Sequence, residues 1–239
     1  MRIHVLKTSR LALLLAGLAC LSFVSGQETK VPAPESLESV RARAEKGDAN
    51  AQLILGVVYI GGEILPQDYA EAVRWLRKAS EQGLAEAQFR LGVRYAQGQG
   101  ATQDYPEAVR WYRKAADQGH ADAQYSLGYM FNNGQGVPQD YAEAARWYRK
   151  AADQGLAVAQ VLLGLMCDLG QGVPQDYVEA HMWLNLAASR ATGADQKKYA
   201  DARDHTATMM TPAQIAEAQR RAREWKPKSN ENTGERPVK

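Results

Sequence analysis

The sequence repeats itself every 36 residues. Four consecutive segments, 47–82, 83–118, 119–154 and 155–190, align without a gap. A glycine, an aspartate and a glutamate recur at fixed places in each segment, and so does a tryptophan, which is Trp75, Trp111, Trp147 or Trp183. A fixed period of about 20 to 50 residues indicates a repeat architecture, in which each unit is one supersecondary element. The period therefore constrains the fold more tightly than any other feature of the chain.

The first half of each unit predicts a helix. In the segment 119–154 this helix spans about Ala121 to Asn132 and is followed by the turn residues 133–136, Asn-Gly-Gln-Gly. One side of the helix carries small and apolar residues that recur in the other units, here Ala123, Leu127, Gly128 and Phe131. Small residues at fixed columns allow paired helices to approach closely.

The second half predicts a clearer helix. Asp140 is a favourable N-cap, and Glu143 three residues later completes the sequence pattern of a capping box. Apolar residues then follow at helical spacing, namely Tyr141, Ala144, Trp147, Tyr148 and Ala151. Gly155 can adopt the left-handed conformation that ends a helix. The unit is therefore a helix-turn-helix.

A single pair of such helices would leave one apolar face in water, and stacking the next unit covers it. We therefore predict an all-α fold, a right-handed α-solenoid of four 36-residue helix-turn-helix repeats with helical caps at both ends. The folded domain is expected over 35–226, with an N-terminal helix from Ser36 to Lys46 and C-terminal capping helices within 194–226. The polar tail 227–239 is predicted to be disordered.

Three motifs carry a resemblance to a known family. They are A-Q-x-x-L-G-x-x-Y (Ala87 to Tyr95), G-Q-G-V-P-Q-D-Y (Gly134 to Tyr141) and E-A-x-x-W-Y-R-K-A-A (Glu107 to Ala116). Together they resemble the Sel-one-like repeat, a relative of the tetratricopeptide repeat. The resemblance implies a scaffold or adaptor that holds other proteins. A cysteine-rich exported branch of the family binds or hydrolyses β-lactams, but the paired cysteines of that branch are absent here.

The N-terminus has the order of a secretory signal peptide: basic residues, the apolar run Leu11 to Val24, then small residues. We predict a signal peptide over 1–26 with cleavage before Gln27, a linker over 27–34, and a periplasmic or secreted protein. An alternative places Cys20 in a lipoprotein box, which gives a lipid-anchored, membrane-attached form. No later segment is apolar enough to span a membrane, so no transmembrane segment is expected in the mature chain.

Composition argues against nucleic-acid binding. Residues 1–26 hold three of the 29 basic side chains and none of the 27 acidic ones, so the formal charge without them is −1. A nucleic-acid partner is not expected at this charge. The mature chain has one cysteine, Cys167, in a column that otherwise holds Tyr59, Tyr95 and Phe131, so we interpret it as a buried hydrophobic residue.

No catalytic, cofactor-binding or metal-ligating residues are predicted. Acidic pairs such as Asp104 and Glu107 recur at every helix start, which favours capping over acid-base catalysis. The histidines His120, His181 and His205 are scattered and lack the spacing of metal ligands. The Gly-Gln-Gly stretches precede turn residues and lack the lysine of a phosphate-binding loop. The sequence therefore predicts that the protein is not an enzyme.

Basic residues recur in the second helix of three units. They are Arg74, Arg77, Lys78, Arg110, Arg113, Lys114, Arg146, Arg149 and Lys150. This basic ladder complements the helix dipole and can pair with acids such as Glu71 and Glu143. Alternatively, it lines one face and attracts an anionic polymer.

Columns that vary between units indicate a recognition surface. In the first helix of each unit we predict that residues at spacing i, i+4, i+7 line this surface. In the middle two units these partner-binding candidates are Arg90, Arg94, Gln97, Ser126, Met130 and Asn133. The corresponding residues of the outer units are Ile54, Val58, Gly61, Leu162, Met166 and Leu169.

The sequence thus predicts an exported scaffold that binds another protein or peptide in the groove of a helical-repeat solenoid. Two alternatives stay open at this point. One is a cell-envelope hydrolase or β-lactam-binding protein on the same fold. The other is a structural protein that assembles by end-to-end stacking of its solenoids.

Overall fold

A computed structural model describes residues 36–228 and places eleven α-helices and no strand among them. The helices are α2 (Leu37–Glu45), α3 (Ala49–Gly61), α4 (Tyr69–Glu81), α5 (Ala85–Gln97), α6 (Tyr105–Asp117), α7 (Ala121–Asn133), α8 (Tyr141–Asp153), α9 (Ala157–Leu169), α10 (Tyr177–Arg190), α11 (Gly193–Ala207) and α12 (Pro212–Glu224). The predicted signal peptide 1–26, with Cys20, and the linker 27–34 lie outside the described residues. So does the predicted tail, except Pro227 and Lys228.

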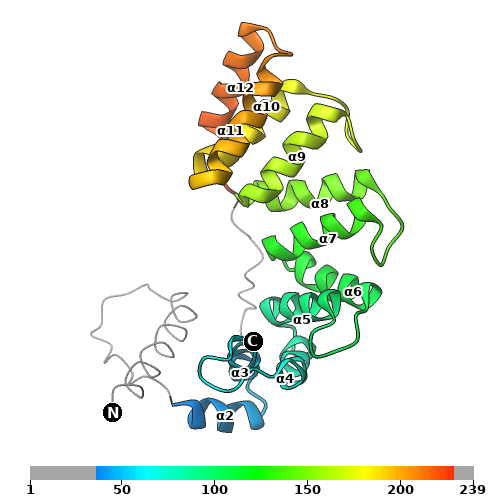
Figure 1. Cartoon of the computed structure of the whole chain (residues 1–239), viewed down its shortest axis with the longest axis vertical. Helices are drawn as coiled ribbons and strands as arrows, with labels where there is room; N and C mark the ends of the chain where they lie inside the picture. The colour runs from blue at the N-terminus through cyan, green and yellow to red at the C-terminus, as the bar shows by residue number, and fades with distance from the viewer. Residues whose placement is uncertain (1–35, 229–239) are drawn as a thin grey trace, which may run out of the picture. The chain divides into compact units, whose positions relative to one another are not determined.

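The described helices alternate between two roles. We call α3, α5, α7 and α9 the A-helices, because each begins a repeat, and α4, α6, α8 and α10 the B-helices (Figure 1). The chain divides after Gln103 into a first compact unit, with α2 to α5, and a second, with α6 to α12. Within each unit successive helices pack against one another, as α3 does on α4 and α8 on α9. The all-α solenoid of four repeats is therefore confirmed.

Each B-helix begins at the aspartate that the sequence indicated. The carboxylates of Asp68, Asp104, Asp140 and Asp176 all accept hydrogen bonds from backbone N–H groups of the first turn. In α8 the Glu143 carboxylate accepts from Arg146 instead of reaching back to the N-cap, so the predicted reciprocal box does not form there. Among the described helices, a reciprocal capping box is present at the start of α12, where the side chains of Thr211 and Gln214 each bond to the other residue's backbone N–H.

Small residues allow the A-helix and B-helix of one repeat to lie in close contact. A Cβ added to Gly128 of α7 would lie 2.8 Å from the Tyr148 ring of α8, and one added to Gly56 would lie 2.7 Å from Leu76. The four repeat tryptophans are all at most 7% exposed. Their indoles fill the space between helices, so core packing, rather than ligand stacking, explains their repetition.

A second close approach joins each repeat to the one before it. The loop glycines Gly100 and Gly136 have φ angles of +77° and +73°, and a Cβ on Gly100 would lie 2.0 Å from the carbonyl oxygen of Tyr69. The connection between an A-helix and its B-helix thus crosses the first turn of the preceding B-helix. In the first repeat Ile64 takes this column, and the helix before that repeat is α2.

The chain after α12 returns to the third repeat. The Trp225 ring centroid lies 6.2 Å from that of Trp183. The Arg190 guanidinium lies 4.4 Å from the centroid of the Trp225 ring. The Lys228 backbone N–H donates to the Asp153 carbonyl, and the Lys228 ammonium lies 2.7 Å from the Asp153 carboxylate. We call Trp225–Lys228 the C-terminal clamp, because it ties the end of α12 to the end of α8.

The loop crossing makes a testable prediction for stability. Gly83→Ala places a side chain in open space at a φ of +94°, so it should lower the free energy of unfolding by about 1–2 kcal/mol. Gly100→Ala adds a collision with the backbone of Tyr69 and should cost roughly 3 kcal/mol or more. Urea unfolding followed by circular dichroism measures both variants. Equal losses in the two variants would show that the crossing is not close in solution.

Candidate functional site

The A-helices present one side to solvent, which we call the A-helix face. It consists of residues at spacing i, i+4, i+7, i+11, none of which belongs to the small-residue contact with the B-helix. These residues are Asn50, Ile54, Val57 and Gly61 in α3; Glu86, Arg90, Val93 and Gln97 in α5; Asp122, Ser126, Tyr129 and Asn133 in α7; and Val158, Leu162, Leu165 and Leu169 in α9. Their chemistry differs from helix to helix, while the inward columns that begin with Ala51, Leu55 and Gly56 keep one residue type in all four repeats.

Three of the predicted partner-binding residues belong to α5 in the first unit. Arg90 is half-buried and forms an ion pair with Glu86, one turn earlier. Arg94 donates to the Gln99 side chain, and its guanidinium lies 5.4 Å from the Tyr69 ring centroid. Gln97 is exposed at the end of the helix. Arg90 and Gln97 therefore lie on the A-helix face, whereas Arg94 is held against the B-helix side.

The other three belong to α7 in the second unit. Ser126 and Asn133 lie on the A-helix face, and the Asn133 amide donates to the Tyr129 carbonyl. Met130 does not, because it is 4% exposed and packs in the core, as do Val58 and Met166 of the same column. Exposure thus agrees with the predicted surface in its first and last columns and contradicts it in the middle one, where Val58, Met130 and Met166 are buried. Partner binding by the exposed residues stays a prediction.

The column that sequence reasoning missed holds Val57, Val93, Tyr129 and Leu165. All four are apolar, which is the pattern of a core position, yet Tyr129 is 44% exposed and Leu165 37% exposed. The available signal was geometric. Counted from Asp122 in α7, Tyr129 at i+7 continues the face set by Asp122 and Ser126, whereas Met130 at i+8 turns toward the core.

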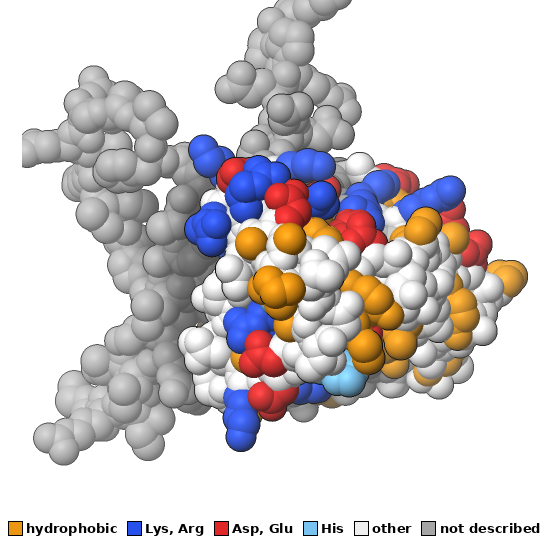
Figure 2. Space-filling model, turned by 90° about the horizontal axis from the view of Figure 1, so that it is seen from above, with side chains coloured by type: hydrophobic (Ala, Val, Ile, Leu, Met, Phe, Trp, Pro, Cys, Tyr) orange, Lys and Arg blue, Asp and Glu red, His pale blue; other side chains and the backbone are white. Residues whose placement is uncertain are grey.

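Four large hydrophobic side chains of the described chain are exposed: Tyr129, Leu165, Leu169 and Met209. Leu169 and Met209 belong to neighbouring helix ends, since Thr206 donates to the Asp168 carboxylate at 2.8 Å. Figure 2 looks onto the end of the second unit where α10, α11 and α12 lie, and hydrophobic side chains gather there apart from the main band of charged ones. Clustered exposed apolar residues mark an interaction site more often than scattered ones do.

Tyrosines extend this surface along the second unit. Tyr199 of α11 packs against Val161 and Leu184. Burial raises the pKa of Tyr125 above its usual range, and the nearby Tyr129 and Tyr199 add to the shift. Tyr125 also lies 6.0 Å from the buried Tyr148 ring. Tyrosines of α7 and α11 therefore lie near one another in the second unit.

The B-helices carry the basic ladder, whose members are largely engaged within the fold. Arg74, Arg110 and Arg146 each form an ion pair with the glutamate three residues earlier. The Lys114 and Lys150 ammonium groups lie 4.1 and 3.8 Å from the ring centroids of their repeat tryptophans. These contacts favour a solvated, self-compensating face over an anion-binding one.

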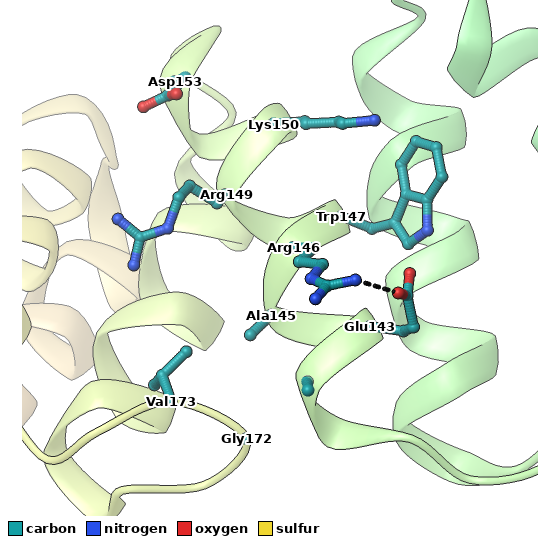
Figure 3. A pocket seen from close by; sticks show the side chains of 10 residues that line it. Glu143, Ala145, Arg146, Trp147, Arg149, Lys150, Asp153, Gly172 and Val173 are labelled. Carbon is teal, nitrogen blue, oxygen red and sulfur yellow. Dashed lines mark hydrogen bonds and ion pairs between the residues drawn. The ribbon is translucent and has the colours of Figure 1, made fainter.

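A cavity of about 600 Å³ opens on the B-helix side of the third repeat (Figure 3). It is lined by Ala142, Glu143, Ala145, Arg146, Trp147, Arg149, Lys150, Asp153, Gly172 and Val173. Ala145 contributes to the space, because its column holds the larger Val73 and Val109 in the first two repeats. Most charges that line the cavity are already paired, Arg146 with Glu143, Arg149 with Glu179 and Asp153 with Lys228, while the Lys150 ammonium lies on the Trp147 ring. A ligand would have to displace these partners.

No cluster of three or more His, Cys, Asp or Glu side chains suited to a metal ion occurs among the described residues. Burial raises the pKa of the Cys167 thiol to about 12, so this cysteine stays protonated and unreactive near neutral pH. Cys167 is 1% exposed, which confirms its interpretation as a buried hydrophobic residue. Within residues 36–228, no helix has the length and apolar character needed to cross a membrane.

One buried polar side chain departs from the repeat pattern. His181 of α10 is 3% exposed and takes the column of Val73, Val109 and Ala145. Its Nδ1 atom is buried without a hydrogen-bond partner among the described residues. Burial lowers the pKa of His181 below its usual value and the nearby Arg203 lowers it further, while Asp204 opposes them. The imidazole is therefore neutral in the folded protein near neutral pH.

His181 predicts a pH-dependent stability. Because the folded pKa is lowered, the unfolded chain binds the proton more tightly, so the free energy of unfolding should fall as pH drops below about 6.5 toward the folded pKa. His181→Val, which restores the residue of the first two repeats, should flatten this dependence, whereas the exposed His205→Ala should not. Urea unfolding at pH 7.5 and 5.5 measures the difference. The same slope in wild type and His181→Val would contradict the assignment.

Comparison with known proteins assigns the family. The model of the Sel1 repeat matches four consecutive stretches, residues 49–84, 85–120, 121–156 and 157–191. The chain belongs to the Sel1 repeat family. The matched stretches cover the four repeats derived above, shifted by two residues at each start. The resemblance found in the sequence is thereby confirmed.

Two solved structures support the same assignment. The first is c5321, a protective antigen present in uropathogenic Escherichia coli strains that displays an SLR fold, at 37% identity and a TM-score of 0.67. It is matched over 80% of this chain and 41% of its own, so this chain spans about two fifths of that protein. The second is a Sel1 repeat protein from Oxalobacter formigenes, at 31% identity, a TM-score of 0.64 and coverage of 80% and 81%. A search of the curated proteins found no significant match.

Proposed function

We propose that this Sel1 repeat protein is an exported scaffold that binds another protein or peptide on its A-helix face. Sel1 repeat proteins generally serve as protein-interaction scaffolds. The observation that supports the proposal most directly is the contrast between columns of the A-helices: the inward alanine, leucine and glycine columns keep the same residue in all four repeats, while the A-helix face changes its chemistry from α3 to α9. Packing alone requires no such variation, because exposed positions contribute little to stability.

The clustering of exposed apolar side chains supports the second unit as the main contact region. Tyr129 and Leu165 lie on neighbouring repeats of one face, and tyrosines are favourable contact residues because they bury a large area with few rotatable bonds. The B-helix face has mostly paired charges instead. Exposed ion pairs contribute little affinity and depend strongly on salt.

If the partner binds the A-helix face, substitutions on that face should reduce partner capture, and substitutions on the B-helix face should not. The purified full chain is immobilised and challenged with an envelope extract, and captured proteins are quantified by mass spectrometry. Tyr129→Lys with Leu165→Lys should reduce recovery of the captured partner at least about tenfold, because two ammonium groups would be buried unpaired. The B-helix control Arg146→Ala, whose side chain is 72% exposed, should keep it. Undiminished capture by the A-helix variant would reject the proposed face.

Export is the second component of the proposal. It is supported by the basic, apolar and small-residue order of residues 1–26. N-terminal sequencing of the protein isolated from its native cells should find Gln27 as the first residue and the protein outside the cytoplasm. A chain that begins with lipidated Cys20 would assign the lipoprotein alternative. A cytoplasmic chain that keeps residues 1–26 would contradict export.

A further inference from the structure

The A-helix face of α9 is unusually apolar. Val158, Leu162, Leu165 and Leu169 occupy its four positions, and we call them the apolar stripe. At 100° per residue the four side chains lie within about 60° of one another around the helix. Val158 and Leu162 are half-buried, Leu165 is 37% exposed and Leu169 is 68% exposed. The stripe thus runs along the whole helix and becomes more exposed toward its end.

Packing within the fold does not require this stripe. The inward side of α9 holds the same kind of buried residues as the other A-helices, namely Ala159, Leu163, Gly164 and Cys167. The equivalent outward positions are polar at Asp122 and Asn133 in α7, and they hold the ion pair of Glu86 with Arg90 in α5. Those helices fold with polar residues at these columns. Among the four A-helices, α9 alone has aliphatic side chains at all four of them.

The stripe carries no charge. Within α9 the only acidic or basic side chain is Asp168, and its carboxylate accepts a hydrogen bond from Thr206 of α11 at 2.8 Å. Of the α7 residues on the same face, Ser126 and Asn133 are neutral, and Asp122, in the column of Val158, is the acidic one. A matching surface must also be uncharged, because a charge buried against the stripe would lose its hydration without gaining a partner. Tyr129 and Met209 extend the same apolar character on either side.

The backbone hydrogen bonds of a bound segment indicate whether an extended peptide or a helix occupies the stripe. One kind of extended peptide adds to a sheet edge, and the described residues contain no strand; another, the polyproline type, docks in grooves lined by aromatic rings, whereas the stripe is aliphatic. A peptide laid on helices would leave its own backbone groups unpaired wherever it excludes water. A helix satisfies its backbone internally, and its side-chain ridges can fit between those of α9.

We propose that the apolar stripe of α9 docks an amphipathic α-helix of a partner protein, with an uncharged leucine-type side facing the stripe. This proposal rests on the proposed function and specifies the partner for the second unit. Leu162 and Leu165 form the centre of the contact, and Tyr129 and Met209 lie at its margins.

Two synthetic peptides of about 20 residues and identical composition test the proposal. In one, leucines follow steps of four and three residues among Ala, Gln and Lys; in the other, the leucines alternate. Fluorescence anisotropy with the purified full chain should show saturable binding of the helical peptide, at least about tenfold tighter than binding of the alternating one. Binding of the helical peptide should also raise its helical circular dichroism signal.

Variants locate the binding site. Leu165→Glu with Leu169→Glu should weaken binding of the helical peptide at least about tenfold. The matched control introduces the same two charges outside the A-helix face, at the exposed residues Ala216→Glu with Gln219→Glu of α12, and should leave the affinity within about twofold. Melting curves establish that both variants are folded; both change exposed or half-buried residues.

Three results would overturn the proposal: equal binding of the two peptides, no saturable binding of the helical peptide, or equal losses in the two double variants. A wild-type dimer in sedimentation that Leu165→Glu with Leu169→Glu dissociates would assign the stripe to a second copy of the chain and also overturn it. If the envelope partner is still captured through the A-helix face while both peptides fail, the proposed function stands and the helical occupant is rejected.

Discussion

The structure depends on one constraint: a helix hairpin of this size cannot cover its own apolar side. The glycine column of Gly56, Gly128 and Gly164 draws the two helices of a repeat together, and the loop glycines let the next repeat cross the start of the preceding B-helix. Each hairpin is thus completed by its neighbour. Because every contact of this kind is short-ranged along the chain, the fold tolerates variation wherever a residue faces neither neighbour.

That freedom explains the contrast between the two faces. In the first three repeats the B-helix face keeps a compensated pattern, in which Arg146 pairs with Glu143 and Lys150 lies on Trp147. In α10 the same columns hold Met182, Asn185 and Leu186. The A-helix face carries an ion pair in α5, tyrosine and amides in α7, and aliphatic side chains in α9. Proteins that recognise partners commonly combine a constant scaffold with a variable surface. Here the division follows the two sides of each hairpin.

Most of the fold could be predicted from the sequence, because the period, the aspartate N-caps and the tryptophan column each indicate the same hairpin. The surface was predicted less well. The columns of Ser126 and Asn133 were placed on the correct face, but Met130 was assigned to it and Tyr129 was not. Adjacent positions of a short apolar helix differ by 100°, and both residues are apolar, so composition could not separate them. The contacts of Trp225 with Trp183 and Arg190, and of Lys228 with Asp153, had no local signal in the sequence.

The C-terminal clamp has a consequence for how such arrays change length. Lys228 pairs with Asp153, and the equivalent positions of the earlier repeats hold Asp117 and Glu81, also acidic. Trp225 rests near Gly155, whose column is glycine in every repeat. If a repeat were duplicated and inserted before the last one, Lys228 would again find an acidic side chain and Trp225 would again find a glycine. Gene duplication could lengthen the array without any redesign of its terminus.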